Sequence, residues 1–280
     1  MKLEFDYVIA GGGSAGCALA SRLCEDKSIT VCVVEAGGNG NNLFIKMPAG
    51  NGFVFGNPKL DWGYKSIPQK NLNNRTIYFP RGKSLGGSSI VNGMIYMRGI
   101  PSDYDSWRQL GLNGWGYSDI LPYFKKSEGS EHRNNKYHGN KGPLKIERSS
   151  NYGILEEAFI KSAVKAGHKS IDDFNGSERT GVSRLDSTVS NGVRQSSAIS
   201  YLKKKPDNLT ILTHQQISKL LINKTDVIGL ETLKSTKVYC KREVIICQGA
   251  FGTPHLLMLS GIGPADHLIE NDITPIVDLP

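Results

Sequence analysis

Three glycines and one glutamate near the N-terminus have the types and spacing that bind a dinucleotide. Gly11, Gly13 and Gly16 form a G-x-G-x-x-G motif, and Glu35 stands where the next apolar run ends. Gly11 would permit the tight turn, Gly13 would let the backbone approach a pyrophosphate, and Gly16 would let a helix pack closely on a strand. The Glu35 carboxylate would accept hydrogen bonds from an adenosine ribose. The pattern therefore predicts a dinucleotide site.

The segments around these residues are those that such a site needs. Tyr7–Ala10 is typical of a buried strand, Cys17–Cys24 of a helix and Thr30–Val34 of a second strand. Where the helix begins, its free N–H groups and the positive end of the helix dipole would face the pyrophosphate. A glycine-rich turn between strand and helix also arises for purely geometric reasons. The motif alone does not distinguish FAD from NAD.

Two later glycine-rich stretches also have the composition of ligand-facing segments. Pro80–Gly99 is dense in glycine and serine and then turns apolar at Ile90–Met97. Such a segment would lay backbone amides against a flat or phosphorylated ligand, and a flexible surface loop is the alternative. Gly249–Pro254 follows the apolar run Val244–Cys247 and opens a helix, which again predicts a cofactor-facing sheet edge.

The rest of the chain predicts a mixture of helices and strands. Trp107 and Trp115 are expected to anchor a core, and residues 128–143 to form an exposed polar loop. His132 and His138 lie in that loop, but no third ligand has a supporting spacing, so no metal site is expected. Expected helices are Asp103–Leu110, Ser118–Ser127, Ile154–Ala166 (amphipathic), His255–Ser260 and Ala265–Glu270, and expected strands are Leu144–Glu147, Leu209–Leu212, Gln216–Ile222, Val227–Leu233, Lys237–Tyr239 and Val244–Cys247.

Composition places the chain among ordinary soluble globular proteins, with 280 residues, 39% hydrophobic and 21% charged. No apolar run reaches membrane-spanning length and residues 1–20 lack a signal peptide, so a cytoplasmic location is expected. The net charge of +8 is dispersed and no nucleic-acid module is present, which favours a solvated surface over nucleic-acid binding. Weak attraction to a membrane surface stays open. The five cysteines are irregularly spaced, so reduced buried thiols are expected.

Three blocks of this sequence resemble the glucose–methanol–choline (GMC) flavin oxidoreductases, close in character to their choline and alcohol dehydrogenases. The first is the glycine fingerprint with Glu35, the second is Gly82–Asn92 (GKSLGGSSIVN) and the third is Gly249–Gly263 (GAFGTPHLLMLSGIG). The resemblance implies FAD rather than NAD. It also implies an α/β fold, a Rossmann-like FAD-binding domain of the GMC type with part of an α+β substrate-binding domain. The FAD-binding domain would comprise residues 1–143 and 191–280, and residues 144–190 would begin the substrate-binding domain.

The resemblance also assigns roles to residues of this chain. Val91 stands where some relatives carry a histidine that attaches FAD covalently, so non-covalent FAD is expected. By resemblance, the ADP half would be bound by Gly11, Gly13, Gly16 and Glu35, the flavin half would be approached by Ser84, Asn92, Gly93, Met94 and Ile95, and Ile217 would lie in the strand whose backbone meets the adenine. Ser14, Ala15 and Gly87 are also expected to bind the cofactor.

The activity that the resemblance implies is oxidation of a primary alcohol or a choline-like CH–OH donor. A histidine base would take the hydroxyl proton while hydride passes to the flavin. That histidine lies in the C-terminal half of the family, so no catalytic residue is expected here and the chain is expected to be an N-terminal fragment. The electron acceptor stays open between oxygen, a quinone and another carrier. Alternatives are an inactive FAD-binding remnant, a subunit completed by a separately encoded half, and an NAD-dependent dehydrogenase.

Overall fold

The computed structural model describes residues 3–148 and 153–280, which divide into two compact units. The first unit comprises Met1–Asn92 and Ser196–Pro280, and the second comprises Gly93–Gln195. The chain thus leaves the first unit and returns to it, as the late α/β pattern predicts. The units divide after residues 92 and 195, whereas the functional domains expected from the sequence divide after 143 and 190. That functional assignment stays a prediction.

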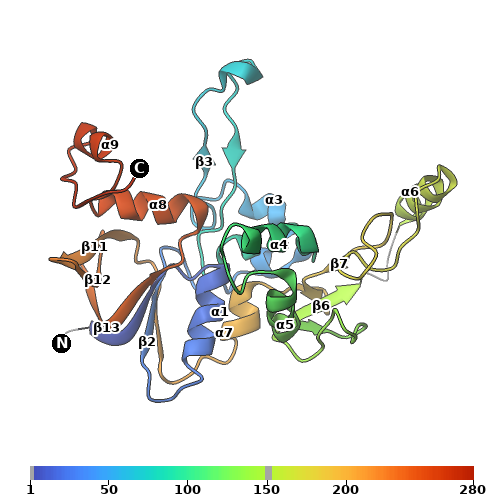
Figure 1. Ribbon diagram of the computed structural model, residues 1–280, viewed down its shortest axis with the longest axis horizontal. Helices are drawn as coiled ribbons and strands as arrows, with labels where there is room; N and C mark the ends of the chain where they lie inside the picture. Colours follow the sequence, from blue (N-terminus) through green and yellow to red (C-terminus); the bar gives the residue numbers. More distant parts are fainter. Residues whose placement is uncertain (1–2, 149–152) are drawn as a thin grey trace. The chain divides into compact units, whose positions relative to one another are not determined.

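A six-stranded mixed sheet forms the centre of the first unit (Figure 1). Its first four strands pair in parallel, and the last two pair antiparallel. Parallel neighbours need a crossover connection. Between the first two strands of the chain, a glycine turn and a helix provide it. The strands, in spatial order, are β10 (Leu209–Leu212), β2 (Val31–Val34), β1 (Leu3–Ala10), β13 (Lys237–Ile246), β12 (Asp226–Thr232) and β11 (Ile217–Asn223).

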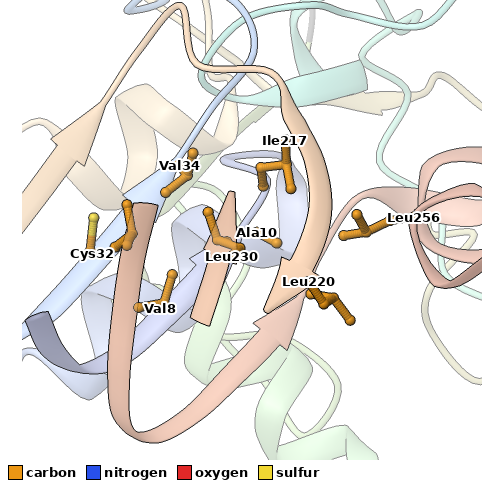
Figure 2. Packing of buried hydrophobic residues seen from close by; sticks show 9 residues of the cluster. Val8, Ala10, Cys32, Val34, Ile217, Leu220, Leu230 and Leu256 are labelled. Atoms are coloured by element: carbon orange, nitrogen blue, oxygen red, sulfur yellow. The ribbon is translucent and has the colours of Figure 1, made fainter. Parts of the chain in front are cut away.

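Alternating side chains of β1 fill two cores, one on each face of the sheet. Val8 and Ala10 point to one face and Ile9 to the other, as the two-residue period of a strand requires. Figure 2 shows the first face, where Val8 and Ala10 lie among buried side chains of β2, β11 and β12 and Leu256. The other core holds Ile9 and buried residues of β2 with two helices. Those helices, α1 (Ser14–Leu23) and α7 (Ser197–Leu202), pack side by side.

The first unit also holds a further long helix and several short elements. Helix α8 (Gly249–Leu259) carries Leu256 and packs against β11. Strands β3 (Tyr64–Lys65) and β4 (Tyr78–Phe79) form an antiparallel pair. The others are α2 (Leu43–Lys46), α3 (Asn51–Val54), α9 (Ala265–Glu270), the 3-10 helices Pro48–Gly50, Lys70–Leu72 and Gly87–Ile90, and the strands β14 (Ile262–Gly263) and β15 (Val277–Asp278).

The second unit combines helices with small sheets. Strand β6 pairs in parallel with β5 and antiparallel with β7, and β8 pairs with β9. Its elements are α4 (Pro101–Gln109), α5 (Tyr117–Ser127), β5 (Glu128–Ser130), β6 (Leu144–Arg148), α6 (Ile154–Lys165), β7 (Asp186–Ser187), β8 (Val189–Ser190) and β9 (Val193–Arg194).

Several expectations about this unit are wrong. Trp107 and Trp115 are not core anchors, because 42% and 53% of their surfaces are exposed and they pack edge to face on each other. Helix α6 forms where expected, but none of its residues is buried, and Phe159 on its apolar face is 69% exposed. The stretch 128–143 is not uniformly exposed, since Glu128 and His138 are completely buried.

In the first unit, two expected strands form one strand. The cysteines are free thiols, as expected, and three of the five are buried. Lys237–Tyr239 and most of Val244–Cys247 belong to one strand, β13, which ends at Ile246 and pairs with β1 from Val238 onward. The other two cysteines are half-buried. Burial raises the pKa of Cys17 and of Cys32 to about 12, so both thiols stay protonated.

Candidate cofactor site

The glycine turn after β1 has the conformation that its motif predicts. Gly11 lies in the left-handed region, at φ +101°, and its N–H donates to the carbonyl of Val34 at 2.9 Å. A Cβ at Gly16 would lie 2.0 Å from the carbonyl oxygen of Gly11. Only glycine at position 16 therefore lets α1 approach the end of β1 this closely.

Gly13 differs from its neighbours because the protein itself leaves room for a side chain there. A Cβ at Gly13 would meet only Cys247 O and Gly87 Cα, both at 3.8 Å, which is ordinary contact. No side chain caps the first turn of α1, where Ser14 and Ala15 are exposed, so their N–H groups have no partner within the helix. The space and these donors fit a pyrophosphate, which binds at helix N-termini for both reasons.

Glu35 lies buried beside the turn, with 6% of its surface exposed. Its Oε2 accepts the N–H of Gly12 at 2.9 Å, and its Oε1 accepts the N–H of Gly37 at 2.8 Å. Burial raises the pKa of this carboxyl group, against the opposing effect of these N–H donors and the positive charge of Lys83. Each carboxylate oxygen has a second acceptor position, so Glu35 has the capacity to accept ribose hydroxyl groups as well.

The second glycine-rich stretch closes on this turn. Gly86 donates its N–H to Gly12 O at 2.8 Å, and a Cβ at Gly87 would lie 2.7 Å from Gly13 Cα. Ser84 is buried and its hydroxyl donates to the carbonyl of Gly38 at 2.8 Å, so this hydroxyl already has a protein partner. Ser84 and Gly87 therefore lie beside the fingerprint, as expected, and the stretch is not a free surface loop.

The third stretch and β11 also reach this edge of the sheet. Cys247 donates its N–H to the carbonyl of Ala10 at 2.8 Å, which places the start of α8 beside the glycine turn. Ile217 is a buried core residue of β11 (Figure 2), and Gln215 donates its N–H to the carbonyl of Glu35 at 2.9 Å. The backbone that leads into Ile217 thus contacts the acid of the fingerprint.

The remaining predicted residues divide between the two units. Asn92 is an exposed residue at the end of the first unit, with its carbonyl accepting from the Asn51 side chain at 3.4 Å. Gly93, Met94 and Ile95 begin the second unit. These three residues are placed only within the second unit. Their approach to the flavin stays a prediction.

Two glycines were missed by the sequence reasoning. Gly12 supplies an N–H to Glu35, and a Cβ there would lie 2.5 Å from the Leu85 side chain. Gly37 supplies the other N–H, and a Cβ there would lie 1.9 Å from Lys83 O. The signal for both was present, because Gly12 is the middle of three consecutive glycines and Gly37 lies two residues after Glu35.

The second unit holds a buried ionic cluster that involves one of the histidines considered as metal ligands. His138 lies between two carboxylates, with Nδ1 2.6 Å from Glu128 Oε1 and Nε2 2.8 Å from Asp173 Oδ2. Burial acts to lower the pKa of His138, but hydrogen bonds to Asp173 and Glu128 and their charges outweigh it and raise the pKa to about 9. The protonated imidazole of His138 is therefore a structural cation. Within residues 3–148 and 153–280, no three His, Cys, Asp or Glu side chains group as metal ligands.

The stability of the second unit is expected to fall as the pH rises through 9. The raised pKa means that protonated His138 contributes fully below about pH 6.5, the ordinary value, and loses its contribution as it deprotonates near 9. We expect the thermal midpoint to drop by roughly 5 °C between pH 7 and 10, or about 2 kcal/mol. The fluorescence of Trp107 and Trp115 measures unfolding of this unit in a chain that carries Trp62→Phe, because Trp62 is the third tryptophan and lies in the first unit. The His138→Gln variant should lack this step, and an identical step in the variant would contradict the assignment.

The first unit is thus an α/β fold with the glycine turn, helix start and buried acid of a dinucleotide-binding domain. The chain belongs to the GMC oxidoreductase family, whose model matches residues 5–277. It is 42% identical over 283 residues to the oxygen-dependent choline dehydrogenase of Rhizobium etli, covering 99% of this chain and 51% of that protein. The α/β, Rossmann-like fold expected from the resemblance is confirmed.

Two solved structures show the same fold over nearly the whole chain. Pyridoxine 4-oxidase from Mesorbium loti has a TM-score of 0.93 at 34% identity, covering 99% of this chain and 55% of that one. An FAD-dependent oxidoreductase from Chaetomium thermophilum has a TM-score of 0.91 at 32% identity, covering 99% and 51%. The chain thus spans about half the length of these relatives. Across the part of the chain that the structure describes, no helix combines the length and apolar character needed to cross a membrane.

Proposed function

We propose that this chain binds FAD through its first unit and forms the cofactor-binding part of an oxidoreductase acting on CH–OH groups. The observation that carries the proposal is the geometry at Gly13, where the fold leaves open space beside unpartnered helix N–H groups and the buried Glu35. Membership of the GMC oxidoreductase family and the FAD-dependent relative support FAD over NAD.

The chain's own residues would hold and orient the cofactor. The N–H groups of Ser14 and Ala15 and the dipole of α1 would hold the pyrophosphate over Gly13. Glu35 would accept the ribose hydroxyl groups, and the backbone before Ile217 would meet the adenine. Bound FAD would supply the two-electron oxidant that takes hydride from the donor carbon. Ser84, Gly87 and Asn92 to Ile95 are proposed to approach the flavin half.

We propose that the FAD is held without a covalent bond. Val91 has no nucleophile and is 5% exposed, packed in a buried cluster with Ile45, Val54, Leu60 and Ile90. Its side chain is therefore engaged in the core of the first unit.

The substrate proposed is a small primary alcohol or choline-like donor, and oxygen is one electron acceptor. The support comes from relatives, which include an oxygen-dependent choline dehydrogenase and a pyridoxine 4-oxidase. No catalytic residue is assigned within these 280 residues. His138, the most buried histidine described, is held between two carboxylates and has no free nitrogen to act as a base.

Binding selectivity tests the proposal. The purified chain is titrated with FAD while flavin fluorescence is followed, and FMN, ADP and NAD⁺ are added as competitors. We expect FAD to bind, ADP to displace it because the ADP half carries the contacts at Glu35 and Gly13, and FMN to compete poorly. Displacement of FAD by NAD⁺ more readily than by ADP would contradict the proposal and favour an NAD-dependent enzyme.

A further inference from the structure

The buried ionic cluster of the second unit closes into a ring of contacts that begins and ends on one irregular segment, residues 96–98. The Arg98 guanidinium pairs with Glu128, Glu128 binds His138, and His138 binds Asp173. Asp173 in turn accepts the N–H of Asn175 at 2.8 Å. All the side chains of the ring are buried or nearly so, with at most 15% exposed for Asp173. Breaking such a buried charged network at one member costs several times more than losing a surface pair.

Asn175 returns the ring to the segment from which it starts. Its Oδ1 accepts the N–H of Arg98 at 2.9 Å, and its Nδ2 donates to the carbonyl of Tyr96 at 3.0 Å. The Arg98 side chain also donates to the carbonyl of Tyr137 at 2.8 Å. The ring therefore fixes residues 96 to 98 both through their backbone and through the Arg98 side chain.

The other side of the same segment is held by β7 and the residue after it. Thr188 donates its N–H to Met94 O at 2.7 Å, and Tyr96 donates its N–H to Asp186 O at 2.8 Å. Met94, whose carbonyl makes the first of these contacts, is in the left-handed region, at φ +62°. A left-handed non-glycine residue costs about 1 kcal/mol or more and persists only where its surroundings over-determine it.

We propose that the ring of Arg98, Glu128, His138, Asp173 and Asn175 is a positioning device that keeps the strained segment 93–96 in one conformation for the flavin. The assignment of this segment to the flavin rests on the proposed function; the hold on the segment rests on the contacts alone. The buried charges of the ring contact a segment to which we assign no catalytic side chain. We therefore infer that the position of the segment matters. None of its five members is a catalytic residue.

Two variants break the hold at different points. His138→Gln removes the central cation and keeps a side chain of similar length. Asn175→Leu keeps the charges and removes only the two bonds to Arg98 and Tyr96, so it carries the test if His138→Gln does not fold. Glu178→Gln is the matched control, because Glu178 forms an exposed ion pair with Lys169 in the same unit and lies outside the ring.

Hydrogen exchange measured without FAD tests the hold. We expect amides of residues 93–99 to exchange at least 10-fold faster in His138→Gln and Asn175→Leu than in the natural chain, with β1 and β13 unchanged and with no effect of Glu178→Gln. Unchanged protection of residues 93–99 in the folded variants would overturn the proposal.

Visible circular dichroism and fluorescence of the FAD-loaded chain test the positioning role. We expect the ring variants to bind FAD within about 3-fold of the natural affinity, because the ADP half is bound by the first unit, but to show an altered flavin signal. Faster exchange with an unaltered flavin signal would make the ring purely structural and overturn the positioning role. Failure of the natural chain to bind FAD would instead overturn the proposed function, while the exchange result would still decide whether the ring holds the segment.

Discussion

Gly13→Ala is expected to weaken FAD binding at least 100-fold and to leave the fold intact. The new methyl group would make only ordinary contacts within the protein, at 3.8 Å, but it would occupy the space proposed for the pyrophosphate. Moving the pyrophosphate away from two N–H donors forfeits about 3 kcal/mol or more of charge-assisted hydrogen bonding, which is at least a 100-fold loss of affinity. Titration followed by flavin fluorescence measures the loss, and thermal denaturation checks the fold.

Two other glycines provide the matched comparisons for this variant. Gly16→Ala should destabilise the first unit by about 3 kcal/mol, roughly 10 °C in thermal midpoint, because its Cβ would lie 2.0 Å from Gly11 O. Gly52→Ala should change neither property, since a Cβ at this exposed residue meets nothing within 4 Å. Unchanged FAD affinity in a folded Gly13→Ala variant would show that the pyrophosphate does not lie over this turn.

Glu35→Gln is expected to weaken binding of FAD and of ADP by the same factor, roughly 100-fold. The amide would place an N–H₂ group against the N–H of Gly12 or Gly37 and would lose charged hydrogen bonds to the ribose, each worth about 1.5–3 kcal/mol. Because the ribose belongs to the ADP half, the flavin adds nothing to the loss. Calorimetric titration with each ligand measures both factors.

The control for this variant is Glu25→Gln. Glu25 is an exposed acid whose ion pair with Arg22 is expected to contribute little. An ADP affinity that survives Glu35→Gln while FAD affinity falls would place Glu35 at the flavin half instead and contradict the assignment.

The dinucleotide-binding part of the fold was predictable because its signals are local. The apolar runs that became β1 and β2 flank three glycines whose backbone requirements are strict, and Gly11 and Gly16 have the geometry expected of them. The two strands expected at Lys237–Tyr239 and Val244–Cys247 are separated in the sequence by the charged residues Lys241 to Glu243. Strand β13 continues through them because these residues are exposed while the neighbouring backbone pairs with β1, including a bulge between Phe5 and Tyr7.

The buried ring of the second unit was not predictable from local pattern. Glu128 and His138 lie in a polar, glycine-bearing stretch that has the composition of a surface loop. Their burial depends on Arg98 and Asp173, which lie far away in the sequence, and nothing in a single sequence pairs these charges. The same limit applies to Trp107 and Trp115, whose size predicts a core that the second unit does not form around them.

The absorption spectrum of the purified chain, taken after incubation with FAD and removal of free ligand, shows whether this chain holds FAD without a covalent bond. We expect the two visible bands of oxidised flavin on the folded chain and their complete transfer to the supernatant when the protein is denatured and precipitated. A chain that retains no flavin, or a yellow colour that stays with the precipitate, would contradict this expectation.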